Sequence, residues 1–120
     1  MMQLLLFVAL GGALGSVCRY ILGQIAVVSS TMIINILGSM LLGAFIFIVR
    51  IKMPLEVLDK IVAFVVYGFC GGFTTFSTFS LENFKLIESG HFYAALANIT
   101  FTTGLSIFSI AVFYWLAKKI

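Results

Sequence analysis

The sequence has 120 residues, of which 62% are hydrophobic and 9% are charged, and its formal net charge is +3. Soluble domains carry about 25% charged residues, so this composition excludes a soluble globular protein and indicates an integral membrane protein. The small positive charge comes from lysines and arginines next to apolar runs, and no basic patch with interleaved aromatic residues indicates nucleic-acid binding.

Four long runs of mainly apolar residues predict four membrane-spanning helices, since a bilayer crossing takes about 20 such residues. A β-barrel would instead show many alternating segments of ~10 residues. A long first span followed by three others is also unlike a cleaved signal peptide. We therefore predict an all-α membrane protein with a single four-helix domain over residues 1–120, a short turn near Gln24–Ser30, and spans at roughly 3–23, 31–50, 61–81 and 92–117.

The first span carries Arg19 near its end. Two interpretations of this cation stay open: its side chain snorkels to the lipid headgroups, or it draws anions to a vestibule or fixes a helix end. The span contains no acidic residue, which disfavours a four-helix multidrug or cation exporter with its glutamate embedded in the first helix. Glycines in this span and in the third have the small-xxx-small spacing that allows close helix packing.

The second and fourth spans each carry a polar stripe whose members recur every four residues, and which therefore lies on one helix face. The stripes consist of Thr31, Asn35 and Ser39 in the second span, and Asn98, Thr102 and Ser106 in the fourth, with Ser109 close by. Two interpretations stay open for them: hydrogen bonding between helices, or the lining of a pore or ligand site.

The third span contains the string GGFTTFSTFS, from Gly71 to Ser80. Each glycine weakens a helix by about 1 kcal/mol relative to alanine, and the hydroxyl side chains compete for backbone hydrogen bonds. We therefore predict a helix break near Gly71–Thr75, with carbonyls that line a polar cavity or are buried in protein. Phe76 and Phe79 would then share one side, either as ordinary aromatic packing or with electropositive ring edges presented to an anion.

The remaining polar residues do not indicate catalysis. Glu82 follows the apolar part of the third span and is expected at a helix end facing water, and His91 is expected at the membrane interface. Cys18 and Cys70 are expected to behave as small apolar residues. Because no nucleophile–base pair, phosphate-binding loop or metal-ligand spacing occurs, the sequence does not predict an enzyme.

Four spans place the termini and loops on two sides of the membrane, and five of the seven lysines and arginines fall on one side and two on the other. The side with fewer basic residues holds Lys85, and Arg19 lies near its edge. This bias predicts that the N-terminus lies in the cytoplasm. The side with more basic residues, which also holds both termini, carries Arg50, Lys52, Lys60, Lys118 and Lys119.

Three strings, GGALGSVCRY (Gly11–Tyr20), TMIINILGS (Thr31–Ser39) and GFCGGFTTFSTFSLE (Gly68–Glu82), closely resemble the Fluc (CrcB) fluoride channel family. The resemblance covers the whole chain, and the GGxTTFSTF string is highly specific. It implies a fluoride-specific ion channel of the cell membrane that lowers toxic cytoplasmic fluoride by passive efflux. It also implies a dual-topology dimer, in which two four-helix subunits lie antiparallel with two pores along their interface.

The resemblance further implies roles for individual residues. A central sodium ion, structural and not transported, would be held by the backbone carbonyls of Gly71 and Thr74 from each subunit. Arg19 matches an arginine near the family's vestibule, and Glu82 matches an acidic residue beyond the second pore phenylalanine. The residues along the fluoride path would be Phe76, Phe79, Asn35, Thr31, Thr102 and Ser106.

The identity of the partner subunit stays open. A homodimer of opposed copies needs one chain to insert both ways, whereas the five-to-two bias favours a fixed orientation and pairing with an oppositely oriented homologue. The sequence is therefore consistent with either a homodimer or a heterodimer. A different class of protein, a non-conducting membrane assembly subunit, is disfavoured by the polar stripes and the predicted helix break.

Overall fold

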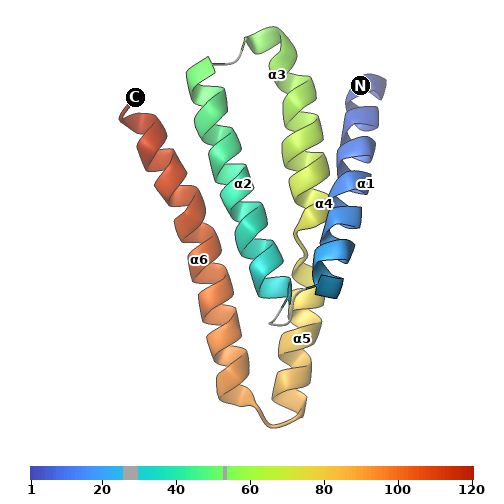
Figure 1. Ribbon diagram of the computed structural model, residues 1–120, viewed down its shortest axis with the longest axis vertical. Helices are drawn as coiled ribbons and strands as arrows, with labels where there is room; N and C mark the ends of the chain where they lie inside the picture. Colours follow the sequence, from blue (N-terminus) through green and yellow to red (C-terminus); the bar gives the residue numbers. More distant parts are fainter. Residues whose placement is uncertain (26–29, 53) are drawn as a thin grey trace.

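The computed structural model describes residues 1–25, 30–52 and 54–120, which contain helices and no strand (Figure 1). Four helical units in them are long and apolar enough to cross a membrane, which confirms the four predicted spans. The predicted turn near Gln24–Ser30 falls largely on residues 26–29, outside the described residues. The elements are α1 (Met2–Ile25), α2 (Ser30–Lys52), α3 (Leu55–Val62), the π-helical segment η1 (Ala63–Cys70), α4 (Gly71–Phe73), α5 (Phe76–Glu88) and α6 (Phe92–Lys118).

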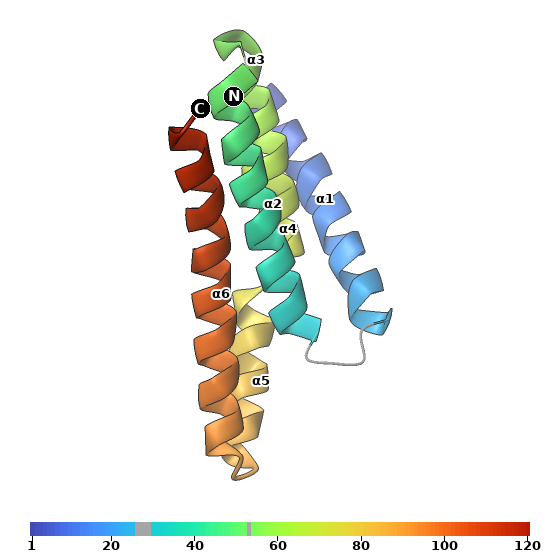
Figure 2. The same ribbon diagram turned by 60° about the vertical axis from the view of Figure 1, so that its left-hand side comes forward.

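The helices run alternately up and down, so that both termini and α3 lie at one end of the molecule (Figure 1). α1 packs along η1 and α4, and α2 packs along α6. α5 packs against α6, and the two form a hairpin that projects beyond the ends of α1 and α2 (Figure 2). The first part of the third span therefore packs against α1, and its second part packs against α6.

The helices of the third span extend beyond both of its predicted ends. Pro54 (φ −66°, ψ 139°) precedes α3, which begins at Leu55 instead of residue 61, and α5 continues to Glu88 instead of residue 81. The edges of the apolar run are therefore not the edges of the helices. Glutamate, lysine and leucine are good helix formers in water as well, so the helices continue past the membrane. Gly90, at φ +82°, then reverses the chain in a conformation that glycine adopts without strain.

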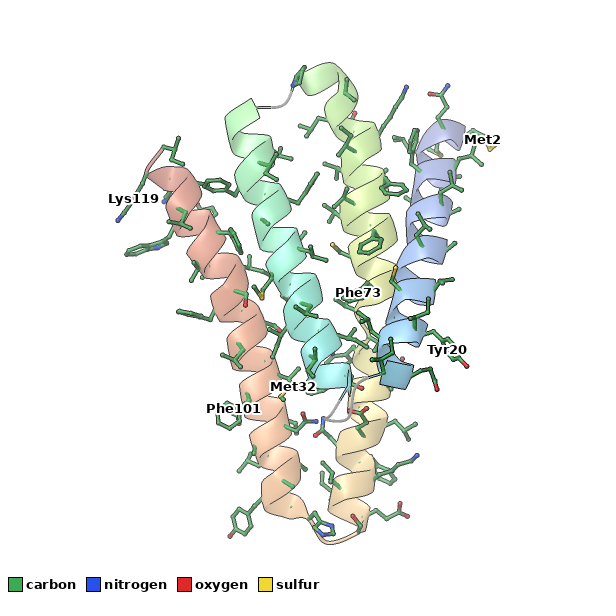
Figure 3. The ribbon with its side chains drawn as sticks, viewed as in Figure 1. Met2, Tyr20, Met32, Phe73, Phe101 and Lys119 are labelled. Carbon is green, nitrogen blue, oxygen red and sulfur yellow. The ribbon has the colours of Figure 1, made fainter. Side chains whose placement is uncertain are left out.

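Most side chains point outward, as expected where lipid surrounds the bundle. Tyr20 on α1 and Phe101 on α6 project away from it (Figure 3) and are 70% and 60% exposed. Lipid tails are as apolar as leucine, so helix association depends on close packing and hydrogen bonds more than on hydrophobic burial. Among the described residues, the buried apolar side chains are Ile34, Ala63, Cys70, Phe73, Phe79 and Ala95.

Close packing is concentrated in a glycine seam, which we define as Gly11 and Gly15 of α1 with Gly68 of η1 and Gly72 of α4. A Cβ atom added at Gly15 would lie 2.2 Å from the Phe69 carbonyl oxygen, and one at Gly72 would lie 2.5 Å from the Gly12 carbonyl oxygen. The backbones of the two helices are thus in direct contact. The seam fixes the position of α4, and with it the start of the helix break.

Candidate functional site

The third span is broken at Thr74 and Thr75. Thr74 (φ −76°, ψ 156°) and Thr75 (φ −149°, ψ 118°) are both extended, whereas Gly71 and Gly72 remain helical in α4. The predicted break is therefore confirmed, but it lies at the end of the predicted stretch. The glycine pair does not itself break the helix, because Gly72 is held helical against α1 in the glycine seam.

Thr74 is the C-cap of α4, and Thr75 is the N-cap of α5. The Thr74 backbone N–H and its Oγ1 hydroxyl both donate to the Cys70 carbonyl, at 3.0 and 2.8 Å, and so complete the last turn of α4. Thr75 is the N-cap of α5, and its Oγ1 accepts from the Thr78 backbone N–H at 3.3 Å. Threonine is a favourable N-cap because its hydroxyl satisfies one of the N–H groups that a helix start leaves unpaired.

Asn35 of α2 pairs with the backbone of Thr75 at the break. Its Nδ2 donates to the Thr75 carbonyl at 3.0 Å, and its Oδ1 accepts from the Thr75 N–H at 2.8 Å. One side chain thereby satisfies both polar groups of an extended residue, where the membrane offers no water to do so. Of the two interpretations of the second-span stripe, hydrogen bonding between helices therefore holds for Asn35.

The break also releases two carbonyl groups. In a continuous helix the Thr75 N–H would donate to the Gly71 carbonyl, but here it donates to Asn35. Likewise the Thr78 N–H, which would donate to the Thr74 carbonyl, donates to the Thr75 hydroxyl. The carbonyl oxygens of Gly71 and Thr74 thus lose their regular helical donors.

A cleft of about 440 Å³, the phenylalanine cleft, opens beside the break. The Phe76 and Phe79 rings lie with centroids 5.8 Å apart and planes at 46°, so the two residues share one side as predicted. Phe79 is 7% exposed and Phe76 is 79% exposed, so one ring is fixed in the bundle and the other projects from it. Residues of α2, the third span and α6 line the cleft, among them Asn35 and Ser39 of α2, Phe76 and Phe79 of α5, and Thr102 and Thr103 of α6.

A second cleft of about 430 Å³, the arginine cleft, lies at the end of α1. Arg19 is half-buried and lines it, together with Tyr20 and the hydroxyl residues Thr31 and Thr78. Thr75 lines both clefts, so the broken segment separates them. Thr31 and Asn35, which belong to one stripe, are therefore divided between two cavities.

The expectation that Glu82 faces water is wrong. Its Oε1 accepts a hydrogen bond from the hydroxyl of Thr31, which is 2% exposed, and its Oε2 is buried and has no hydrogen-bond partner among the described residues. Glu82 lies three residues after Phe79, and residues at this spacing share a helix face. The face of α5 that carries Phe79 into the bundle therefore carries Glu82 inward as well.

The fourth-span stripe joins α6 to α5 through Asn83, a residue that sequence reasoning missed. Asn83 is 5% exposed and accepts from Asn98 Nδ2 at 3.0 Å, and Asn98 Oδ1 accepts from the Thr102 hydroxyl at 3.2 Å. The signal was present, because Asn83 follows Phe79 by four residues and so shares its face. Ser106 Oγ is buried and has no hydrogen-bond partner within the described part of the chain.

Comparison with known proteins gives a consistent result across all four spans. The family described as "CrcB-like protein, Camphor Resistance (CrcB)" matches residues 6–114. The chain is 38% identical to "Fluoride-specific ion channel FluC" of Saccharophagus degradans, over 96% of this chain and 90% of the relative. It is 42% identical to the protein of the same name from Nitrobacter winogradskyi, over 86% of each chain. It is also 40% identical to "Fluoride-specific ion channel FluC 1" of Nitrobacter hamburgensis, over 90% of this chain and 93% of the relative.

Proposed function

The chain belongs to the CrcB family of fluoride-specific ion channels, and from this premise we propose that it carries fluoride passively out of the cell through the phenylalanine cleft. It is an ion channel and not an enzyme, and its four membrane-spanning helices make it a multi-pass protein of the cell membrane. Passive efflux needs no energy source beyond the fluoride gradient, and would lower toxic cytoplasmic fluoride.

The observation that carries the proposal is the pair of phenylalanine rings opposite amide and hydroxyl groups in one cleft. Fluoride is small and strongly hydrated, so a dehydrated path must supply hydrogen-bond donors or positive ring edges. The Asn35 amide has two N–H bonds, and its pairing with Thr75 uses one of them, which leaves the other for an anion. Among the described residues that line the cleft, none is lysine or arginine, and weak sites suit rapid passage.

Other residues would also act on fluoride, and two of them line the arginine cleft, on the other side of the broken segment from the phenylalanine cleft. The Arg19 guanidinium in the arginine cleft would raise the local concentration of anions at an entrance. Thr31, next to Glu82, lies on the same side of the break as Arg19. On α6, the Thr102 hydroxyl lines the phenylalanine cleft, and the buried Ser106 hydroxyl offers a further donor one turn away.

The test of this function is anion efflux from liposomes that contain the purified protein, with fluoride or chloride inside. We expect fast fluoride loss without chloride loss. Replacing Phe79 or Phe76 by leucine should lower the fluoride rate about two- to tenfold, because leucine removes the ring edge but keeps an apolar side chain. Phe84→Leu is the matched control, because Phe84 lies on the same helix, is 60% exposed and does not line the cleft. Equal rates for all three variants would contradict the role of the cleft.

We also propose a structural sodium ion, held by the carbonyls of Gly71 and Thr74. The donor set fits, because both carbonyls have lost their regular helical donors and carbonyls at a helix break bind sodium in membrane proteins. A Cβ atom at Gly71 would approach only the Val66 carbonyl, at 3.7 Å, so this side of Gly71 is open to a second subunit. One chain supplies two oxygens, and a partner that supplies the same two would complete the site.

Removing sodium is therefore expected to abolish fluoride flux. The experiment is prolonged exchange into N-methyl-glucamine buffer, followed by flux and thermal-unfolding measurements, with sodium then restored. Sodium at 100 times its dissociation constant would stabilise the folded state by about 2.7 kcal/mol, so the melting temperature should fall on its removal. Reversing the sodium gradient should leave the fluoride rate unchanged, since the ion is not transported. Full flux after verified removal would refute the sodium site.

We propose that the active form is a dual-topology dimer. The exposed Phe76 and the open side of Gly71 support it, because both functional groups lie at a surface that a second subunit would cover. Both partners considered above, a second copy and an oppositely oriented homologue, fit this surface.

Insertion orientation distinguishes the two dimers. The excess of lysine and arginine at the end that carries both termini predicts that the N-terminus lies inside in most molecules. Reporters fused to each terminus would measure the two populations. A single orientation supports a heterodimer, and equal populations support a homodimer. A variant with Lys118→Gln and Lys119→Gln should shift the population toward equality, whereas Lys85→Gln should make the bias stronger.

A further inference from the structure

A chain of hydrogen bonds between side-chain amides joins the two helices that flank the phenylalanine cleft. Asn83 Nδ2 of α5 donates to the Phe79 carbonyl at 2.8 Å, and Asn83 Oδ1 accepts from Asn98 Nδ2 of α6 at 3.0 Å. Asn98 Oδ1 accepts from the Thr102 hydroxyl at 3.2 Å. The chain thus leads from Thr102 on one wall of the cleft to the backbone of Phe79 on the other.

Hydrogen bonds to neighbouring helices determine the position of α5: the Asn35–Thr75 and Thr31–Glu82 bonds join it to α2, and this chain joins it to α6. Thr74 and Thr75 are extended, so helix continuity does not transmit the placement of α4 to α5. The glycine seam holds α4 but does not reach α5. α5 projects with α6 as a hairpin (Figure 2), and the Asn83–Asn98 hydrogen bond ties the two helices between their turn and the cleft.

The Phe79 carbonyl determines which group donates and which accepts in each hydrogen bond of this chain. The Phe79 carbonyl only accepts, so Asn83 must turn its Nδ2 toward it and present Oδ1 to α6. Asn98 must then donate to Asn83 with its own Nδ2, which leaves its Oδ1 toward Thr102. Thr102 consequently directs its single O–H bond at Asn98, and must rotate that bond to donate to an ion in the cleft.

We propose that Asn83 and Asn98 are positioning residues that set the separation of Phe79 from Thr102 and the orientation of the Thr102 hydroxyl, and thereby keep chloride out. The inference rests on the proposed fluoride conduction. Chloride is larger than fluoride and less strongly hydrated. A cleft whose walls separate admits the larger ion more readily, and it also contacts fluoride less closely.

The test is a double-mutant cycle with Asn83→Leu and Asn98→Leu, in which leucine has a similar shape and no hydrogen-bonding groups. Fluoride and chloride efflux are measured from liposomes, and folding is measured by gel filtration and thermal unfolding. Each single variant should lower the fluoride-to-chloride rate ratio roughly three- to tenfold, the loss expected for one hydrogen bond between membrane helices. The double variant should lose no more than a single one, because both residues act through one tie.

The double variant also guards against misfolding, since it removes both partners of the Asn83–Asn98 hydrogen bond and leaves neither amide unpaired. Thr100→Val is the matched control: the Thr100 hydroxyl is exposed, bonds only to the Leu96 carbonyl of its own helix, and should leave the ratio unchanged. A folded double variant with the wild-type ratio overturns the inference, even if its melting temperature falls, because the amides would then be structural only. Wild-type protein that conducts no fluoride instead refutes the proposed function.

Discussion

Replacing Asn35 by leucine is expected to destabilise the folded protein by about 2–6 kcal/mol and to abolish fluoride flux. The Asn35 amide is paired with both the N–H and the carbonyl of Thr75, which is 8% exposed, so leucine leaves two buried backbone groups unpaired. Each unpaired buried group costs about 1–3 kcal/mol. The broken segment would then rearrange, and the cleft that Asn35 and Thr75 line would lose its shape. Thermal unfolding in detergent and liposome efflux measure the two effects.

Ser39→Ala is the control for this variant. Ser39 lies one turn along the same stripe, and its hydroxyl donates only to the Asn35 carbonyl of its own helix, at 2.8 Å. Its loss should change stability by about 0.5 kcal/mol or less. Wild-type stability in Asn35→Leu would show that the break does not depend on this pairing.

Replacing Gly15 by alanine is expected to have the second large effect. The added methyl group would lie 2.2 Å from the Phe69 carbonyl oxygen and 2.8 Å from the Phe73 nitrogen. Both are backbone atoms, so no side chain can rotate away and the two helices must separate. Overpacking costs typically about 1–3 kcal/mol. The displacement would reach α4, which leads directly into Thr74 and Thr75, so fluoride flux should fall together with stability.

Gly12→Ala is the matched control on the same helix. A methyl group at Gly12 would lie 3.9 Å from the Gly68 carbonyl oxygen, an ordinary van der Waals contact. Alanine is a better helix former than glycine by about 1 kcal/mol, so this variant should be as stable as the wild type or more stable. If Gly12→Ala and Gly15→Ala had the same melting temperature, the glycine seam would not set the position of α4.

The sequence by itself determined the number of spans, the break and the family. The lengths of the apolar runs predict four crossings, because the thickness of the bilayer sets a length that can be counted along the chain. The hydroxyl residues after Gly71 and Gly72 predict a break, because they compete locally with the helix for backbone hydrogen bonds. The string GGFTTFSTFS is specific enough to indicate the family without knowledge of any contact.

Only the tertiary structure decided where these features act. Thr75 is the site of the break because Asn35, 40 positions earlier, satisfies its backbone, whereas Gly72 stays helical because α1 packs against it. Glu82 points inward to Thr31, 51 positions earlier, and Asn83 joins α5 to α6. The π-helical η1 has no sequence signal that we recognise. Span length and helix propensity are properties of neighbouring residues, whereas a buried polar group is stable only beside its partner, and that partner is set by how the helices pack.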